Sequence, residues 1–197
     1  MELLAPPRII LPLASRPEAG TALELVENSG GGAPLQATRV FVSRTDFGLS
    51  VLFHCTDTRP WATITRRDGP LYQEETVEVF LDPFGDLECY FEIEINPLNT
   101  ILDLMIRRVG RGWRKEFAWR CEGLETEVSI VPDGWTARML IPFAALLPEP
   151  PTPGAIWRAN FLRIDRPASA PRELSAWSPT GRNTFHAPER FGYLEFA

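Results

Sequence analysis

The chain lacks the features that would assign it to several large functional classes. None of its 197 residues belongs to an apolar run of about 18 residues, the length that a membrane span requires, so we expect no membrane association. Basic residues number 20 against 26 acidic ones, and a net charge of -6 argues against binding to nucleic acid. A phosphate-binding loop, a nucleotide fingerprint and Ser-His-Asp spacing are also absent.

Cysteine and histidine are scarce as well. The three cysteines have no CxxC spacing, which excludes a disulfide framework and a zinc signature. Haem requires His or Met axial ligands, and the chain offers only His54 and His186 as histidines. The N-terminal stretch MELLAPPRIILPLASRP is interrupted by prolines and has no cationic start, which is unlike a signal peptide. The sequence leaves the cellular location open: cytoplasmic as the sequence stands, or secreted if it is a fragment.

Proline and glycine, by contrast, are abundant. The 19 prolines and 14 glycines are spread over the whole length, as in a protein of many short strands joined by turns. We predict a single domain over residues 1–197, with a loosely specified lead-in at 1–34 and a core at 35–197. The predicted fold class is all-β: a two-sheet antiparallel β-sandwich of jelly-roll or immunoglobulin-like topology with very little helix.

The expected strands follow from alternating apolar residues and turn signals. Outside a central three-strand segment at 71–106, we expect strands at Ala22–Glu27, Thr38–Ser43, Leu49–Cys55, Leu124–Val131, Trp135–Ile141, Trp157–Ile164 and Gly192–Phe196.

The central segment has the clearest pattern in the chain. In TVEVFL, three apolar side chains share one face of the strand and Glu78 points to the other. In YFEIEI, Glu92 and Glu94 point away from the apolar face in the same way. This alternation is typical of antiparallel strands with one face in the core and one face in solvent. The second face carries carboxylates that packing does not require.

Side chains two residues apart in a strand point to the same face, and this rule predicts how the carboxylates are arranged. A regular hairpin places Glu78 near Glu92, with Glu94 one pair further out, and the following hairpin brings Asp103 close to Glu94. Like charges in such positions need an arginine, a cation, a hydroxyl-bearing ligand or raised pKa values. The alternative interpretation is a solvated face with interleaved arginines.

Aromatic residues occur in or beside the predicted loops, as sugar stacking requires. A sugar presents flat C–H faces ringed by hydroxyls, so its site combines aromatic rings with carboxylate or amide groups. Tyr72 lies just before the strand that carries Glu78. The loop aromatics are Trp61, Tyr72, Phe84, Trp113, Trp119 and Phe185.

Four segments together resemble the family 9 carbohydrate-binding modules and their relatives: PWATITRRDGPLYQEETVEVFLDPFGD, EIEINPLNTILDL, WRANFLRIDRP and SAWSPTGRNTFHAPERFGYLEF. The resemblance covers Thr38 to Phe196. It implies a β-sandwich related to the DOMON class, whose members bind sugars or haem. In characterised sugar-binding members, two tryptophans clamp a glucose-type ring while an acid, an arginine, a glutamine and an asparagine hold its hydroxyls.

The resemblance implies roles for individual residues of this chain. Tyr72 and Phe185 correspond to the two clamp aromatics, and Glu78 corresponds to the strand acid. Asn183 and Arg182 lie near the position of the family's asparagine.

Two positions depart from the family's pattern. Glu94 replaces its arginine and Leu162 replaces its glutamine, which removes hydroxyl-binding groups and adds negative charge. The sugar specificity of the characterised modules is therefore not carried over.

We thus predict a non-catalytic domain that binds a mono- or oligosaccharide, as an accessory to polysaccharide breakdown. Tyr72 and Phe185 would form the walls of an aromatic slot that also contains Glu94. Glu78 would accept hydrogen bonds from hydroxyls, helped by Asn183 and by Arg182 or Arg163. Three alternatives stay open: a structural or interaction domain, a glycoside hydrolase with paired acids, and a haem-binding domain.

No cofactor is expected at this stage. The one metal considered is calcium, for which an acidic turn offers oxygen ligands. The alternative for this turn is a set of local side-chain hydrogen bonds. The turn residues concerned are Asp82, Asp86 and Glu88.

Overall fold

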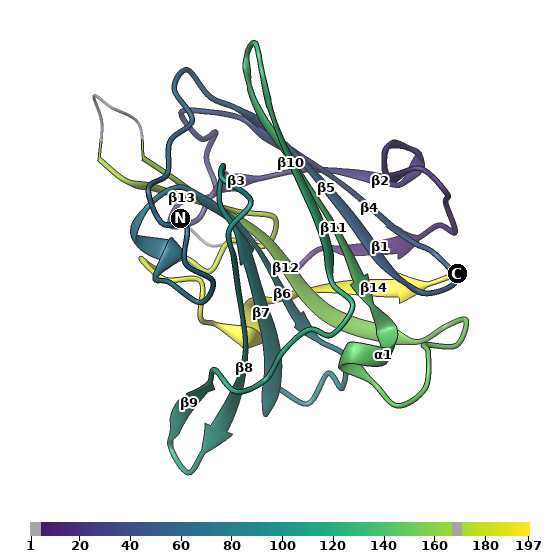
Figure 1. Cartoon of the computed structure of the whole chain (residues 1–197). Coiled ribbons are helices and arrows are strands. Elements are labelled where there is room, and N and C mark those ends of the chain that lie inside the picture. The colour runs from purple at the N-terminus through teal and green to yellow at the C-terminus, as the bar shows by residue number, and fades with distance from the viewer. Residues whose placement is uncertain (1–4, 167–170) are drawn as a thin grey trace.

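The structure, a computed structural model, describes residues 5–166 and 171–197. Within these residues, nine strands form one sheet and five form a second. Figure 1 shows the two sheets packed face to face, with β10, β11, β5 and β4 crossing above β12, β6, β7 and β8. The predicted all-β sandwich is therefore confirmed.

The nine-stranded sheet carries the features that matter for function. Its order is β1 (Arg8–Leu11), β14 (Gly192–Phe196), β12 (Ile156–Asp165), β6 (Thr76–Asp82), β7 (Cys89–Ile95), β8 (Ile101–Val109) and β9 (Gly112–Glu116). At its side, β13 (Glu173–Ala176) pairs with β12 and with β3 (Val26–Glu27). All of these pairs are antiparallel except β1 with β14.

The five-stranded sheet has the order β10 (Glu125–Val131), β11 (Gly134–Pro142), β5 (Gly48–Thr56), β4 (Thr38–Arg44) and β2 (Thr21–Glu24). The helical pieces are α1 (Phe143–Leu146) and three 3-10 turns, η1 (Pro17–Ala19), η2 (Leu71–Gln73) and η3 (Pro188–Arg190). In the described parts of the chain, no helix is long and apolar enough to cross a membrane.

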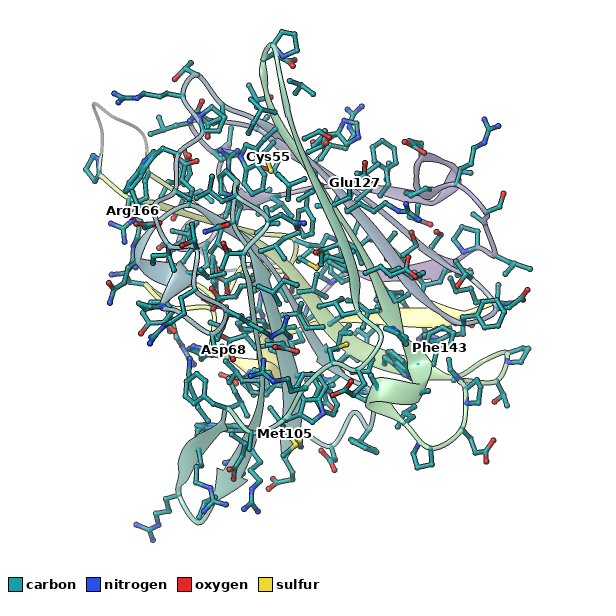
Figure 2. The ribbon with its side chains drawn as sticks, viewed as in Figure 1. Cys55, Asp68, Met105, Glu127, Phe143 and Arg166 are labelled. Carbon is teal, nitrogen blue, oxygen red and sulfur yellow. The ribbon has the colours of Figure 1, made fainter. Side chains whose placement is uncertain are left out.

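Apolar side chains from both sheets fill the space between them and form the inter-sheet core. Figure 2 shows these side chains between the two sheets. Two labelled members of the inter-sheet core are Cys55 on β5 and Phe143 on α1. Gly134 starts β11 at φ 155°, where a Cβ atom would lie 1.9 Å from the carbonyl oxygen of Cys55. Only glycine permits this close approach, so it sets the turn between β10 and β11.

The predicted lead-in is wrong, because residues before 35 belong to both sheets. β1 runs parallel to β14 at one edge, and β2 extends the other sheet beside β4. The single strand expected at Ala22–Glu27 is divided between β2 and β3. Each of these strands has only two to four residues, so alternation alone does not reveal it.

The β6–β7 register differs by two residues from the prediction, so the glutamates stay on the same face. Glu78 is opposite Glu94, and Phe80 is opposite Glu92. The side chain of Asp82 accepts hydrogen bonds from the backbone N–H groups of Gly85 (2.7 Å) and Leu87 (3.2 Å), which extends the turn.

Asp103 lies on the opposite face from Glu94, so its predicted proximity to the acidic face is wrong. It pairs with Ile93 rather than with Glu94, and a one-residue change in register moves a side chain to the other face. Its buried carboxylate lies 2.6 Å from the Nη2 atom of Arg67 and accepts the N–H of Cys121.

The outer face of the nine-stranded sheet is also buried, contrary to the expectation of a solvated face. Apolar side chains of β6, β7, β8, β12 and β13 pack there beneath the C-terminal segment and η2. We call this group the outer cluster. Its members are Leu71, Phe80, Tyr90, Leu102, Leu104, Ile106, Leu162, Ile164, Leu174, Ala176, Phe185 and Phe191.

Candidate functional site

A cavity of 320 Å³ opens on the outer face of the nine-stranded sheet, beside the outer cluster. It brings together five of the seven residues that the sequence predicted for the site: Tyr72, Glu78, Glu94, Asn183 and Phe185. Residues that were not assigned to the site add polar and charged groups to the lining: Glu92, Lys115, Arg172, Thr184 and His186.

The base of the cavity holds three glutamates, Glu78 on β6 and Glu92 and Glu94 on β7, which we call the carboxylate trio. Their side chains are all buried, and one oxygen from each lies within 4.8 Å of the others. Strand pairing forces this proximity, because Glu78 and Glu94 are register partners and Glu92 is two residues away on the same face.

Few groups compensate the negative charge of the trio. The Nζ atom of Lys115 lies 3.6 Å from Oε1 of Glu92, and Nδ1 of His186 lies 3.9 Å from Oε2 of the same residue. Among the described residues, Oε1 of Glu78 and both carboxylate oxygens of Glu94 have no hydrogen-bond partner. Buried oxygens of this kind are costly to leave unpaired, and they are available to accept hydrogen bonds from a ligand.

Burial changes the acidity of the lining groups. It raises the pKa of Glu78 well above its usual value, and the neighbouring charge of Glu92 raises it further. It raises the pKa of Glu94 in the same way, with Glu78 and Glu92 adding to the effect. The pKa of His186 is lowered, mainly by burial. Burial thus favours the neutral forms of Glu78, Glu94 and His186.

The wall of the cavity at residues 183–186 is held by Asn28, which is fully buried. Its side-chain amide donates to Oγ1 of Thr180 (2.9 Å) and to the carbonyl oxygens of Arg182 (2.7 Å) and Thr184 (3.2 Å). Its side-chain oxygen accepts the N–H of Thr180 at 3.0 Å. A residue of the predicted lead-in thus positions the C-terminal side of the site.

The two predicted aromatic walls are not equivalent. Tyr72, on η2, is 43% exposed at the rim, and the Nζ atom of Lys115 lies 5.7 Å from its ring centroid. Phe185 is only 5% exposed and belongs to the outer cluster. His186 follows it, with its ring stacked on Phe80 and Nδ1 at 2.8 Å from the hydroxyl of Tyr90. Tyr72 is therefore the open aromatic surface, and Phe185 supports the wall from within.

Arg163 does not reach the cavity, so its predicted placement is wrong. It pairs with Val77 and faces the inter-sheet side, where it is fully buried. Its Nη2 atom lies 2.7 Å from Oδ2 of Asp57 and 3.0 Å from Oδ1 of Asp165. Arg163 is thus the centre of a structural charge cluster.

Arg182 is also outside the lining. Its exposed guanidinium pairs with Glu189 at 3.0 Å. Its backbone contributes to the wall: the carbonyl oxygen accepts a hydrogen bond from Asn28, and the N–H donates to Oγ1 of Thr180. The prediction that its side chain helps to hold a ligand in the slot is therefore not supported by its position.

The acidic turn considered for calcium uses its carboxylates locally. Asp82 binds the turn backbone as described above, and Oδ1 of Asp86 accepts the N–H of Glu88 at 2.8 Å. Glu88 pairs with Arg108 at 3.0 Å. These contacts are the local hydrogen bonds that the alternative interpretation expects. Apart from the trio, the converging acidic group found in the described residues is Asp57, Glu75 and Asp165.

The two histidines do not share a site that could hold haem. His186 lines the cavity, whereas His54 lies on β5 in the other sheet, with its ring 5.5 Å from that of Phe41.

No protein-family model matches the chain, and no curated protein matches it significantly. Three solved structures are similar over nearly its whole length. A "putative carbohydrate-binding protein" from Bacteroides uniformis superposes with a TM-score of 0.76 at 16% identity, covering 98% of this chain and 100% of that one. The other two are a family 9 carbohydrate-binding module from Caldicellulosiruptor kristjanssonii.

That module is recorded in complex with cellotriose and in complex with glucose. Both structures give a TM-score of 0.71 at 18% identity, and both cover 96% of this chain. They cover 93% and 95% of the module's chain, respectively. The resemblance stated from the sequence is thereby confirmed at the level of the fold: this chain has the β-sandwich fold of the family 9 carbohydrate-binding modules.

Proposed function

We propose that the cavity binds a mono- or oligosaccharide and that the protein is a non-catalytic carbohydrate-binding domain. The observation that carries this proposal is that several groups suited to sugar binding line the same cavity. An open aromatic ring, an amide and three carboxylates come from separate segments of the chain and line one cavity. Its volume of 320 Å³ lies at the low end of the range for ligand sites, which suits a small polar ligand.

The chemistry of the lining matches that of a sugar ring. The exposed ring of Tyr72 offers a flat apolar surface for C–H faces. The unpartnered oxygens of Glu78 and Glu94 accept hydrogen bonds from hydroxyl groups. The side chain of Asn183 both donates and accepts, as vicinal hydroxyls require.

The structural comparisons support the proposal from a second direction. The same fold, in the Caldicellulosiruptor kristjanssonii module, is found with cellotriose and with glucose. We extend sugar binding to this chain as a proposal, because the sequence identity of 18% supports a shared fold and the cavity supplies the chemical argument.

The grouping of the acids at one buried place favours binding over hydrolysis. Glycosidases place two carboxyl groups about 5–5.5 Å apart for retention or about 6.5–9.5 Å apart for inversion, on either side of the bond that breaks. The trio instead gathers three carboxyl groups, with one oxygen from each within 4.8 Å of the others, together at the buried base of a cavity rather than on two sides of it. Release of the aryl group from aryl glycosides, abolished by Glu78→Gln, would contradict the non-catalytic part of the proposal.

Calorimetric titration with glucose and with a panel of cello- and xylo-oligosaccharides tests the proposal. We expect saturable binding, weakened about tenfold or more by Tyr72→Ala and by Glu78→Gln. Phe47→Ala is the matched control, because this aromatic residue is 78% exposed on the β4–β5 loop of the other sheet and does not line the cavity. Absence of saturable binding to the whole panel at millimolar concentration would refute sugar binding.

A further inference from the structure

We propose that the preferred ligand of this cavity is an amino sugar, that is, a sugar residue carrying a free, protonated amine. This inference rests on the proposed function and names the ligand class of the same site. It comes from the charges and unpartnered atoms at the base of the cavity, which a neutral sugar satisfies only in part.

The charged groups that line the cavity do not balance. The three carboxylates of the trio face two permanent cations, Lys115 and Arg172. His186, the remaining titratable group of the lining with a nitrogen base, is held toward its neutral form by burial. When the trio is fully ionised, one negative charge is left without compensation. A ligand with a single positive charge restores neutrality.

The contacts of the two cations are with other residues than Glu78 and Glu94. Lys115 pairs with Glu92, and Nη2 of Arg172 lies 3.5 Å from the side-chain oxygen of Asn183. In the described part of the chain, no cationic side chain forms an ion pair with Glu78 or Glu94. A buried carboxylate without a partner is unfavourable, so an incoming cation is most stabilising at this end of the trio.

The unpartnered atoms match the donors of an ammonium group. Oε1 of Glu78 and both carboxylate oxygens of Glu94 are free acceptors buried beside one another. An ammonium group has three N–H donors and a full positive charge, and its hydrogen bonds to carboxylates are shorter and stronger than those of a neutral hydroxyl. Hydroxyl groups of the same sugar remain available for Asn183.

A divalent metal ion is a poorer match for the same oxygens. Calcium takes six to eight oxygen ligands, and magnesium requires near-ideal octahedral geometry. An ion of charge two would leave the lining with an excess positive charge, because Lys115 and Arg172 already face the cavity. The open ring of Tyr72 also has no role in a metal site, whereas it suits the face of a sugar.

Amine binding should be linked to proton release. Burial raises the pKa values of Glu78 and Glu94, so part of the empty protein holds protons there. The groups that face them are Glu92, Lys115, Arg172, His186 and, through its hydrogen bond to His186, Tyr90. An ammonium ion favours the ionised carboxylates and expels these protons. Affinity should therefore rise with pH from acid toward neutral, until the amine itself loses its proton.

The test compares D-glucosamine, N-acetyl-D-glucosamine and D-glucose by calorimetry just below neutral pH. We expect glucosamine to bind at least about tenfold more tightly than the two neutral sugars. We also expect its heat of binding to vary with the ionisation enthalpy of the buffer, because protons are released. Glu94→Gln should reduce the preference for glucosamine over the two neutral sugars to less than about threefold.

Glu75→Gln is the matched control. Glu75 is a buried carboxyl group whose pKa is raised by burial to about 8, but it belongs to the cluster with Asp57 and Asp165 rather than to the cavity. This variant should keep the preference for the amine.

Three outcomes would overturn the inference. Equal affinity for the three sugars would reject the amine and leave the proposed function standing. Absence of binding by any sugar would reject both. A rise in the melting temperature with millimolar calcium chloride alone, lost in Glu94→Gln, would identify the trio as a metal site.

Discussion

Glu78 on β6 and Glu94 on β7 are register partners, and both carboxyl groups are buried. Two ionised carboxylates in this arrangement repel each other, and burial raises the pKa of each above the ordinary value of 4.5. The folded state therefore keeps protons that the unfolded chain releases. The free energy of unfolding has its full contribution from these groups below about pH 4.5, and this contribution is lost as the pH rises through the raised pKa values.

Glu94→Gln should remove much of this pH dependence. Near pH 8 we expect the substitution to raise the free energy of unfolding by on the order of 1–3 kcal/mol, because a charge no longer has to be buried. Near pH 5 we expect little difference, since the native carboxyl group is then protonated. Urea denaturation at a series of pH values measures both. Glu24→Gln, at an exposed position on β2, should leave the pH profile unchanged, and an unchanged profile in Glu94→Gln would contradict the assignment.

Asn28 is predicted to stabilise the wall of the cavity from a distance in sequence. Asn28→Ala removes hydrogen bonds to Thr180, Arg182 and Thr184, each worth about 0.5–1.5 kcal/mol net. We expect a loss of about 2–4 kcal/mol in the free energy of unfolding, with faster amide hydrogen exchange at 180–186.

Asn183→Ala is the matched substitution for Asn28→Ala, because it removes an amide of the same type from an exposed position in the lining. It should weaken sugar binding while changing the free energy of unfolding by less than about 0.5 kcal/mol. If Asn28→Ala leaves hydrogen exchange in the 180–186 segment unaltered, the wall is held by other contacts.

Strands with a strong local pattern were predictable from sequence, and short edge strands were not. β6 and β7 alternate apolar and polar residues, and both lie within the central segment at 71–106 that this pattern identified. β1, β3 and β13 have four residues or fewer, and their pairing depends on partners far along the chain. The alternation of apolar and polar residues depends only on neighbouring positions. It therefore does not predict which distant strand a short strand pairs with.

The candidate site was likewise predictable only in part. Parity assigned Glu78 and Glu94 to one face, and both do line the cavity. The alternation of apolar and polar residues does not show whether a distant segment covers that face, so the sequence did not predict the burial of the trio. Arg163 was a different error: it lies two residues after the core residue Phe161 on β12, and this spacing already places it on the inter-sheet face.

Tyr72 and Phe185 should respond differently to truncation, because only one of them is buried. Phe185→Ala removes a ring from the outer cluster and should cost about 3–5 kcal/mol of unfolding free energy. Tyr72→Ala should cost less than about 1 kcal/mol, since the ring is 43% exposed. Equal losses in a urea titration would show that Tyr72 is packed more tightly than its exposure indicates. Tyr72 is therefore the cleaner probe of ligand binding.

Arg163 is predicted to stabilise the fold without contacting the ligand. Arg163→Leu leaves the buried carboxylates of Asp57 and Asp165 without their shared partner, and breaking a buried ion pair from one side costs about 3–5 kcal/mol. Arg39→Leu is the matched control, because Arg39 pairs with Glu24 across two exposed strand positions and such pairs contribute little.

Chemical denaturation measures the stability of both arginine variants, and sugar titration of the folded protein measures affinity. We expect Arg163→Leu to be strongly destabilised with its sugar affinity unchanged, because its guanidinium lies on the face of β12 opposite the cavity. Weaker sugar binding by folded Arg163→Leu would mean that the inter-sheet charge cluster and the cavity are coupled through β6 and β12. In that case the two faces of the nine-stranded sheet would have to be treated as one site.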